Sequence, residues 1–485
     1  MIDLPSMTAV LLVVDLTIRG GLALRVVMRR LPVGVTLAWL LTLLAFPIAG
    51  ALLYVLIGEM RLGRKRAHMA EVLRERYEFW LRDVRKRQFT AWETVGADLQ
   101  PLSKLAEQAG HFPALPGNHL ELIGDAHESL RRFISDIDAS RRSCHLEFYI
   151  WHNGGLADQV GEALLRAAGR GVSCRVLLDA VGSHDFFNSE MHGRLKQAGV
   201  QVQEALPAGL IRMLFVRFDL RLHRKIVVID GQVGYTGSLN LVDPDYFKIS
   251  AGVGKWVDSV VRVQGPAVEA MAVAFLEDWE LETGEDLENL RAAADIRSLP
   301  EAGNSAVQLL ATGPMVRQHA IRDVLLTTIY SARHEIVMTS PYFVPDELVL
   351  AALVSAAHRG VDVQLIIPAR VDSLLVRLAS RAQFGDLIEA GVKIMLYSGG
   401  LLHTKSVTVD GRMCLIGSVN LDPRSLYLNF EITLIVYDSF FTCELRALQQ
   451  TYLEQSTAAD LQVWKNRSFV QKMADNLGRL WSPLL

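Results

Sequence analysis

The sequence predicts an α/β protein with two related domains that follow an N-terminal membrane region. An uncharged run over residues 31–58 indicates the membrane region. In each half of the remaining chain, apolar strands alternate with helices. A polar motif occurs twice, as His223-x-Lys225-(four residues)-Asp230 and as His403-x-Lys405-(four residues)-Asp410. A periodic apolar core does not require these residue types in one order, so the repeat indicates a duplicated functional domain.

Length, charge and cysteine content narrow the classes of protein. A chain of 485 residues is too long for one ordinary core, so two or three domains are expected. A net charge of −3 argues against a surface built for nucleic acid. The four cysteines are widely spaced, without the paired pattern of zinc ligands, and predict neither a metal site nor a disulfide framework.

The N-terminus predicts two transmembrane helices within residues 1–60. The uncharged run exceeds the roughly 20 apolar residues that cross a bilayer, which predicts the second span. The preceding stretch, residues 4–28, contains charged residues, but Asp15 and Arg19 lie four apart and can pair on one helix face. A signal peptide is disfavoured because no basic region opens the chain.

The residues after the second span address topology. A basic cluster follows it, and the positive-inside rule then places everything after Gly58 in the cytoplasm. Arginines on the other side weaken this assignment, namely Arg19, Arg25, Arg29 and Arg30. The basic cluster consists of Arg61, Arg64, Lys65 and Arg66. Residues 61–115 are charged and helix-prone, which predicts a juxtamembrane helical linker, either lying at the lipid headgroups or solvated.

Two domains of similar pattern follow, at residues 116–295 and 296–485. Each opens as strand, helix, strand, and an alternation of this kind predicts helices covering a mostly parallel sheet. The strands match at an offset of 189 residues, and the intervening helices correspond as well. The matched strands are 145–150 with 334–339 and 171–178 with 360–367, and the helices are 157–169 and 346–358.

Gly199 and Gly391 open a third matched pair of strands, and from there His223 is 24 residues away in the first half whereas His403 is 12 residues away in the second. The offset is 180 at the two motifs, so the first half has gained 12 residues before its motif. The gained segment is apolar around residues 210–215 and carries Arg212 and Arg217. Such a loop suits a lipid phosphate at a membrane surface, and an ordinary amphipathic segment explains it equally well.

Each motif lies on a predicted strand, which for the first copy is residues 222–229. Residues two apart on a strand point the same way, so the histidine and lysine of each copy share a face. If the halves pack about a pseudo-two-fold axis, the two histidines and two lysines converge on one pocket. This convergence is the central structural prediction.

Such a pocket has what phosphoryl transfer requires. One imidazole can attack phosphorus to give a phosphohistidine, and the other can exchange a proton with the leaving and entering alcohols. The two lysines can hold the non-bridging oxygens, with four further side chains as predicted phosphate ligands. These are Ser238, Asn240, Ser418 and Asn420. No acidic cluster with magnesium spacing accompanies them, so neither a metal nor a cofactor is expected.

Carboxylates on nearby strands complete the predicted site. A reactive histidine usually needs a carboxylate on its far nitrogen, and one lies downstream of each motif, at Asp258 and Glu431. The motif aspartates, Asp230 and Asp410, open turns and are expected to order the strand ends, although they belong to the motif.

The doubled motif resembles that of the phospholipase D superfamily, and the closer likeness is to bacterial cardiolipin synthases with two membrane spans. Further phrases that resemble this family are Glu147-Phe148-Tyr149-Ile150-Trp151, Tyr235-Thr236-Gly237-Ser238, Ser340-Pro341-Tyr342-Phe343-Val344-Pro345 and Gly399-Gly400-Leu401-Leu402-His403-Thr404-Lys405. The resemblance implies two pseudo-symmetric α/β/α sandwich domains, with all six residues of the two motifs in the catalytic set. It also implies a multi-pass protein of the bacterial inner membrane.

The resemblance further implies transfer of a phosphatidyl group between two phosphatidylglycerol molecules, giving cardiolipin and glycerol. By similarity, His223 is the expected nucleophile and His403 the general acid and base. Three alternatives stay open: a membrane-bound phospholipase D that forms phosphatidic acid with water as acceptor, a nuclease, and a scaffold without catalysis. The near-neutral charge and the apolar run disfavour the nuclease, and two intact motifs disfavour the scaffold.

Overall fold

The computed structural model describes residues 4–29, 31, 33–59, 68–69, 72, 84, 91–207, 217, 219–285, 298–314 and 319–480. The chain forms two compact units. One comprises residues 1–68 with 208–220, and the other comprises residues 69–207 with 221–485. The basic cluster at 61–66, most of the charged stretch at 70–90 and the apolar loop at 208–216 lie outside the described residues, so the predictions made for them stay predictions.

The smaller unit is helical. It contains α1 (Leu4–Met28), α2 (Val33–Ala45), α3 (Pro47–Leu53) and a π-helical turn, η1 (Tyr54–Gly58). Asp15 and Arg19 form the ion pair that their spacing predicts. The uncharged run does not form one continuous helix, because the regular α2 geometry is interrupted at Phe46, directly before Pro47.

Length and apolarity of these helices bear on the predicted membrane spans. The uncharged run is divided into helices of 13 and 7 residues, shorter than the roughly 20 residues that a bilayer core requires. Within the described part of the chain, no helix is long and apolar enough to cross a membrane. The prediction of two spanning helices is therefore not confirmed.

The larger unit is built on one sheet of 15 strands in the order β17-β12-β11-β10-β14-β15-β16-β9-β1-β8-β6-β5-β2-β3-β4. Apart from β17, the order is a palindrome about the antiparallel pair of β9 and β1. The strands of the first half are β1 (Ala114–Ile123), β2 (Ser143–Phe148), β3 (Ser173–Asp179), β4 (Gln201–Ala205), β5 (Ile226–Ile229), β6 (Val233–Gly237) and β8 (Val260–Gln264). Those of the second half are β9 (Ser305–Thr312), β10 (Glu335–Thr339), β11 (Asp362–Pro368), β12 (Lys393–Tyr397), β14 (Ser406–Val409), β15 (Met413–Gly417), β16 (Glu431–Tyr437) and the edge strand β17 (Ser456–Ala458).

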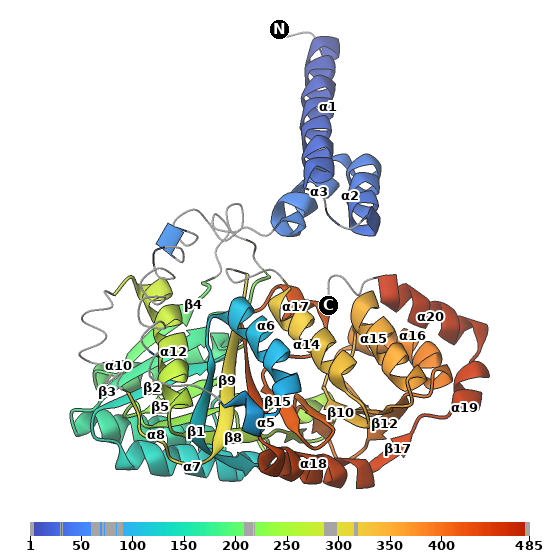
Figure 1. Ribbon diagram of the computed structural model, residues 1–485. Coiled ribbons are helices and arrows are strands. Elements are labelled where there is room, and N and C mark those ends of the chain that lie inside the picture. The colour runs from blue at the N-terminus through green and yellow to red at the C-terminus, as the bar shows by residue number, and fades with distance from the viewer. Residues whose placement is uncertain are drawn as a thin grey trace. The chain divides into compact units, whose positions relative to one another are not determined.

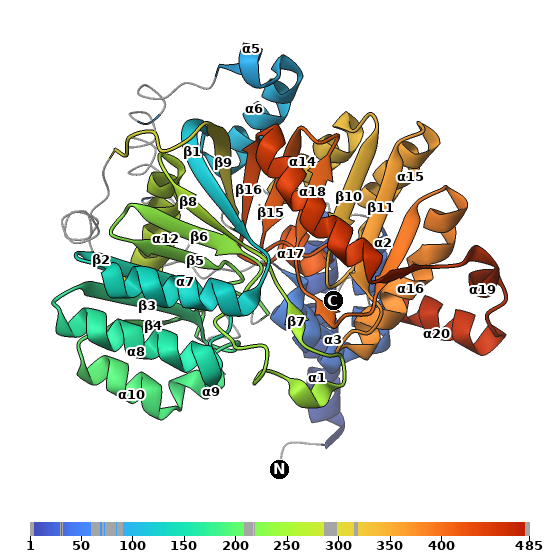
Figure 2. The same cartoon turned by 90° about the horizontal axis from the view of Figure 1, so that it is seen from below.

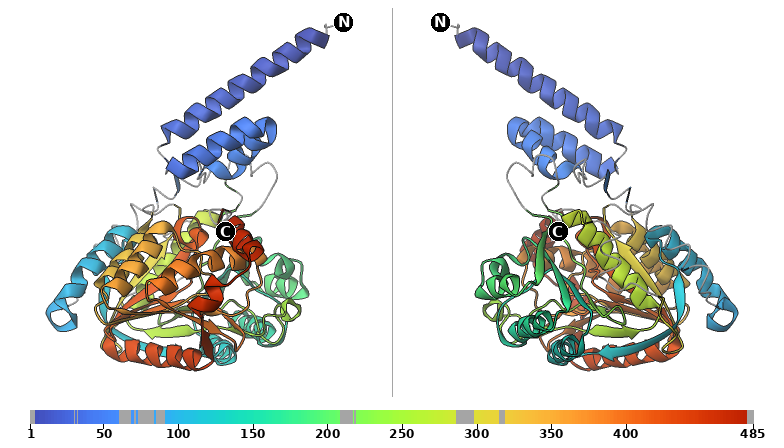
Figure 3. Two further views of the ribbon diagram at one scale, coloured as in Figure 1. Left: turned by 90° about the vertical axis from the view of Figure 1, so that its right-hand side faces the viewer. Right: turned by 90° about the vertical axis from the view of Figure 1, so that its left-hand side faces the viewer.

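Helices cover both faces of each half of the sheet (Figures 1 and 3). In the first half, α7 (Ala126–Ala139) and α8 (Gly155–Gly169) lie opposite α12 (Ala267–Thr283). In the second half, α14 (Ala320–Ser331), α15 (Glu347–His358) and α16 (Leu374–Glu389) lie opposite α18 (Ser439–Glu454). Shorter helices complete the unit, namely α5 (Trp92–Val95), α6 (Gln100–Gly110), α9 (His184–Phe187), α10 (Glu190–Gln197), α17 (Pro423–Tyr427), α19 (Leu461–Lys465) and α20 (Phe469–Leu480), with 3-10 turns η2 (Ala97–Leu99) and η3 (Ile249–Ala251). The predicted layered α/β architecture is thus confirmed.

One predicted boundary needs correction. Helix α6 falls within the stretch assigned to a juxtamembrane linker, but it packs on α14 and β9. Its residues Leu102, Ala106 and Ala109 are buried in the same apolar cluster as Val324. The stretch from about residue 91 to 115 therefore belongs to the core of the larger unit.

The register of the repeat also needs correction. Strand β2 pairs with β5 through Glu147 and Ile226, and β10 pairs with β14 through Thr339 and Ser406. Ile226 and Ser406 each follow a motif lysine, so Glu147 corresponds to Thr339 at an offset of 192, not 189. An apolar strand pattern tolerates such a slip, whereas the pairing of backbone groups does not.

Candidate active site

The two motifs lie one in each half of the sheet, at β5 and at β14, and Figure 2 shows the two halves of the sheet side by side. Each His–Lys segment is an extended stretch directly before its strand, because β5 begins at Ile226 and β14 at Ser406. The prediction of one strand over 222–229 is therefore too long, and Leu222 instead forms an isolated parallel bridge to Phe430. The histidine segment of the first half thus pairs with the second half.

The same pairing is repeated with the halves exchanged. Strand β7 (Trp256–Val257) of the first half pairs in parallel with β13 (Leu401–Leu402) of the second. The amide of His403 donates to the Val257 carbonyl at 2.8 Å, as the amide of His223 donates to the Phe430 carbonyl at 2.9 Å. Each histidine is therefore placed beside the strand that carries a carboxylate of the other half.

The side chains complete two crossed histidine–carboxylate pairs. His223 Nδ1 lies 2.8 Å from Glu431 Oε2, and His403 Nδ1 lies 2.6 Å from Asp258 Oδ1. All four side chains are buried. The sequence identified both carboxylates, and the structure assigns each to the histidine of the other half. With Nδ1 held by a carboxylate, Nε2 is the nitrogen left for chemistry.

Burial and charge decide the protonation states. Burial lowers the pKa of His223 to about 4 and that of His403 to about 3, although the facing carboxylates oppose this effect. Burial penalises the carboxylate charges of Asp258 and Glu431, but the histidines and lysines outweigh it and lower the pKa of both. These pKa directions favour neutral imidazoles and ionised carboxylates at neutral pH.

The two motif lysines converge on the histidines as predicted. Lys225 Nζ donates to the carbonyl of His223 at 2.7 Å, and Lys405 Nζ donates to the carbonyl of His403 at 2.6 Å. Burial lowers the pKa of Lys225 to about 8 and also lowers the pKa of Lys405. The charges of both lysines lower the pKa of both histidines, so the four groups share one electrostatic environment.

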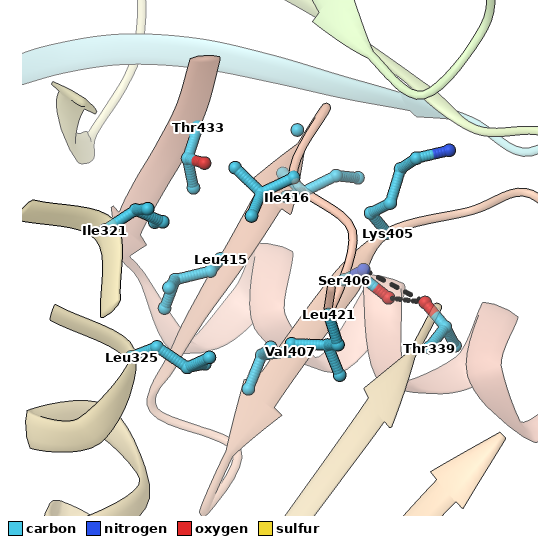
Figure 4. Close-up of a pocket in the computed structure, with 12 residues that line it drawn as sticks. Ile321, Leu325, Thr339, Lys405, Ser406, Val407, Leu415, Ile416, Leu421 and Thr433 are labelled. Carbon is cyan, nitrogen blue, oxygen red and sulfur yellow. Dashed lines mark hydrogen bonds between the residues drawn. The ribbon is translucent and has the colours of Figure 1, made fainter. Parts of the chain in front are cut away.

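Lys405 also borders a small apolar cavity of about 30 Å³ (Figure 4). Its hydrocarbon stem lies beside Ile416, and the ammonium group is turned away from Leu325 and Val407. The hydroxyl of the next residue, Ser406, is hydrogen-bonded at 2.8 Å to that of Thr339 on the neighbouring strand β10. The lysine stem is therefore packed against apolar side chains while its charge faces the histidines.

The predicted phosphate ligands have other partners in this structure. The hydroxyl of Ser238 donates to Asp258 Oδ1 at 2.6 Å, and that of Ser418 donates to Glu431 Oε2. Asn240 Oδ1 accepts from the Ile150 amide at 3.2 Å. Among the described residues, Asn420 Oδ1 is buried without a hydrogen-bond partner. Phosphate binding by these four side chains stays a prediction, and the serines orient carboxylates.

The motif aspartates order backbone, as their turn position predicted, and a part in catalysis stays a prediction. Asp230 accepts hydrogen bonds from the amides of residues 141–143, and Asp410 accepts from the amides of residues 333–335. Both have positive φ, 52° and 51°. These contacts fasten the start of β2 and β10 to the end of β5 and β14.

Sequence reasoning missed Arg224. Its guanidinium is buried and donates to the Thr312 carbonyl at 3.1 Å, to the Glu431 carbonyl at 3.2 Å and to the Asp278 carboxylate. Arg224 thereby ties the strand that carries Glu431 to α12. Its position between His223 and Lys225 could have drawn attention to it, but its partners are far away in the chain and the sequence does not indicate them.

A group of potential metal ligands lies outside the doubled motif. Among the described residues, one group of potential ligands brings its atoms within 4.8 Å of one another, formed by His127, Asp243 and Asp245. Lys255 is ion-paired with Asp245, so a cation already faces the group. None of the three belongs to the doubled motif.

Comparisons with known proteins decide the family. A family model described as "Cardiolipin synthase, PLD-like domain" matches residues 133–279 and 325–454, and a model described as "Phospholipase_D-nuclease N-terminal" matches residues 21–59. Cardiolipin synthase A of Cronobacter sakazakii is 43% identical over 466 residues, which are 96% of each chain. The chain belongs to the cardiolipin synthase family.

Other relatives agree. Cardiolipin synthase A of Yersinia pseudotuberculosis is 42% identical over 96% of both chains, and that of an Escherichia coli strain is 43% identical over the same share. A crystal structure of phosphatidylserine synthase from Haemophilus influenzae matches the fold with a TM-score of 0.60 at 14% identity, covering 80% of this chain and 100% of that one. The family resemblance in the motifs is thus confirmed over nearly the whole chain.

Proposed function

We propose that the protein transfers a phosphatidyl group reversibly from one phosphatidylglycerol to the glycerol hydroxyl of another, which yields cardiolipin and free glycerol. The observation that carries this proposal is the pair of crossed histidine–carboxylate contacts, His223–Glu431 and His403–Asp258. Two imidazoles whose Nδ1 atoms are held leave two Nε2 atoms for a nucleophile and a proton carrier. Family membership supports the choice of substrate.

The first step forms a phosphohistidine. Nε2 of neutral His223 attacks phosphorus, the bond between phosphorus and the headgroup glycerol oxygen breaks, and protonated His403 gives its proton to that oxygen. Glycerol then leaves. His403 must be protonated for this step, and a bound anionic phosphate favours that state because it offsets the charges of Lys225 and Lys405, which lower the histidine pKa.

The second step returns the site to its starting state. The glycerol hydroxyl of a second phosphatidylglycerol gives its proton to His403 and attacks phosphorus, and His223 is released. Lys225 and Lys405 are placed to stabilise the charge that develops on the non-bridging oxygens in both steps. The assignment of His223 as nucleophile rests on family resemblance, since the two pairs are nearly symmetric.

Membrane association belongs to the same proposal. Large apolar side chains of α1 are more than half exposed, among them Val10, Leu11 and Val13. Apolar side chains on this scale are expected to contact lipid. We place the protein at the bacterial inner membrane with its larger unit on the cytoplasmic side, and we expect neither a cofactor nor a nucleic-acid partner.

A single-lipid assay tests the reaction. The purified protein is incubated with vesicles of headgroup-labelled phosphatidylglycerol as the only lipid, and the products are resolved by mass. Cardiolipin with released glycerol, absent in His223→Ala and His403→Ala, is the expected result. Phosphatidic acid with glycerol would mean that water is the acceptor and that the protein is a phospholipase D. No product from any phospholipid donor would favour the scaffold alternative.

A further inference from the structure

Helix α20, near the C-terminus, packs on the protein through its polar face and exposes its apolar face. Its residues Gly478 and Asp475 are buried against α16, where a Cβ on Gly478 would lie 2.5 Å from the Leu378 side chain and Asp475 lies 3.4 Å from Arg381. Ordinary surface helices bury apolar residues and expose polar ones. In α20 the two buried residues are instead a glycine and an aspartate.

The apolar residues of α20 point away from the protein. Five large side chains are between 46% and 78% exposed and fall within an arc of about 100° on the helix. These are Phe469, Val470, Met473, Leu477 and Leu480. No contact within the described residues covers this arc, so a partner of apolar character is needed to bury it.

The charges beside the apolar arc indicate which partner that is. Residues 465–480 contain four basic residues against one acidic residue, although the whole chain carries a net charge of −3. Lys472 and Arg479 lie two turns apart on one flank of the arc and are exposed. An apolar face bordered by basic side chains is typical of helices that lie in the interface of an anionic bilayer.

The helix is connected to the active site through α16. Gly478 faces Leu378 and Asp475 faces Arg381, so the two helices run antiparallel. Leu374 and Leu375, at the start of α16, are also exposed and extend the apolar surface. Just before them, Asp372 accepts hydrogen bonds from Lys248 and Tyr342, each at 2.8 Å.

Lys248 leads to the reacting groups. Its ammonium lies 5.4 Å from the centroid of Trp256, and the Trp256 ring lies 4.3 Å from that of His403. The exposed Ile249 follows Lys248 directly. A chain of contacts therefore links the start of α16 to one of the two histidines, through Asp372, Lys248 and Trp256.

We propose that α20 docks on an anionic lipid bilayer, with its apolar arc inserted at the headgroup level, and so holds the mouth of the active site against the substrate surface. The inference rests on the proposed function for its choice of lipid, and it names the part of the larger unit that meets the membrane. Phosphatidylglycerol, which is anionic, is then both the docking surface and the substrate.

A fluorescence experiment on the full chain tests the docking. Met473→Cys in a Cys443→Ser background is labelled with an environment-sensitive probe, since the other cysteines are buried. The protein is reconstituted in vesicles of phosphatidylglycerol with brominated acyl chains. Phe440→Cys is the matched control, because Phe440 is equally large and 74% exposed but lies on α18, on the opposite face of the sheet (Figure 3).

The docked helix predicts at least about twofold quenching at position 473 and none at position 440. Equal quenching at the two positions, or none at 473, would overturn the proposal. Equal quenching at 473 in purely zwitterionic vesicles would overturn the role of anionic lipid. A change at 473 that depends on protein concentration without vesicles would show that a second copy covers the face instead.

A kinetic comparison separates this inference from the proposed function. The triple variant Phe469→Ser, Met473→Ser, Leu477→Ser is expected to lose about tenfold in transfer rate on vesicles, yet to stay within about twofold of wild type on monomeric short-chain phosphatidylglycerol. An unchanged thermal midpoint verifies the fold. Equal losses on both substrates would overturn the docking role, whereas a wild-type protein inactive on both but quenched at 473 would overturn the proposed function alone.

Discussion

His223 Nδ1 lies 2.8 Å from Oε2 of Glu431, a residue 208 positions further along the chain. The second pair, His403 with Asp258, spans the halves in the opposite direction. Neither half of the molecule therefore contains both a motif histidine and the carboxylate that holds its Nδ1 atom. Each half contributes one histidine and one carboxylate, and the function that we propose depends on the pairing of each histidine with the carboxylate of the other half.

Removing the charge of one carboxylate is expected to abolish most of the activity. In Glu431→Gln, the amide no longer holds the proton on Nδ1 of His223 or stabilises positive charge on that ring. The turnover number is expected to fall about 10²- to 10⁴-fold, as for other histidines that lose an orienting carboxylate. The assay is cardiolipin formation. Glu335→Gln, the same change at the first residue of β10, is the control.

Asp258→Asn should have the same effect through His403. If Glu431→Gln instead left the rate unchanged, the crossed pairs would have no part in the chemistry.

Acid is expected to destabilise the larger unit through its buried histidines, among them the two of the candidate site. Their folded-state pKa values of about 4 and about 3 lie below the ordinary value of 6.5, so the unfolded chain binds protons that the folded one excludes. Their contribution to stability is present above about pH 6.5 and is lost as the pH falls toward 4 and below. For His223 the loss is on the order of 3 kcal/mol.

Denaturant midpoints measured between pH 7 and pH 4 provide the check. His223→Gln should flatten this dependence, because glutamine does not titrate. A midpoint that falls as steeply in the variant as in the wild type would contradict the assignment.

The motif aspartates are expected to matter for stability more than for rate. Asp230→Ala removes the acceptor of several backbone amides and leaves alanine at a φ of 52°, which together should cost about 2–4 kcal/mol in free energy of unfolding. Asp230→Asn tolerates that φ and keeps one acceptor oxygen, so it should cost less. Activity per folded molecule should stay within a few-fold of the wild-type value. A loss of several powers of ten would show that Asp230 takes part in catalysis.

Arg224 can be tested by a double-mutant cycle. Arg224→Met leaves Asp278 buried without its ion-pair partner and should lower the free energy of unfolding by about 3–5 kcal/mol. Replacing both residues, as Arg224→Met with Asp278→Leu, should recover much of that loss because no unpaired charge is left. Chemical denaturation measures these free energies. If the double variant lost as much as the two single variants together, the two side chains would act independently.

The serines distinguish positioning from phosphate binding. If Ser238 acts by holding Asp258, Ser238→Ala should lower kcat while leaving KM for phosphatidylglycerol nearly unchanged, with a loss of about tenfold for one charge-assisted hydrogen bond. If the hydroxyl binds phosphate in substrate and transition state alike, KM should rise with kcat unchanged. Ser418→Ala provides the same test through Glu431.

Residue types and their order determined much of this protein. The doubled motif identified both histidines and both lysines, and alternation of strands and helices predicted the layered α/β architecture. The strands downstream of the motifs offered Asp258 and Glu431 as orienting carboxylates, because a reactive imidazole usually needs one. Such features are local, so a single sequence displays them directly.

Only the tertiary structure decided which parts meet. The pairing of β7 with β13, and of Leu222 with Phe430, assigns each carboxylate to the other half, and no spacing along the chain encodes that choice. The same holds for Arg224 with Asp278, and for α20, whose apolar arc none of the described residues covers. Apolar periodicity predicts that a face will be buried, but the identity of what buries it depends on contacts between residues hundreds of positions apart.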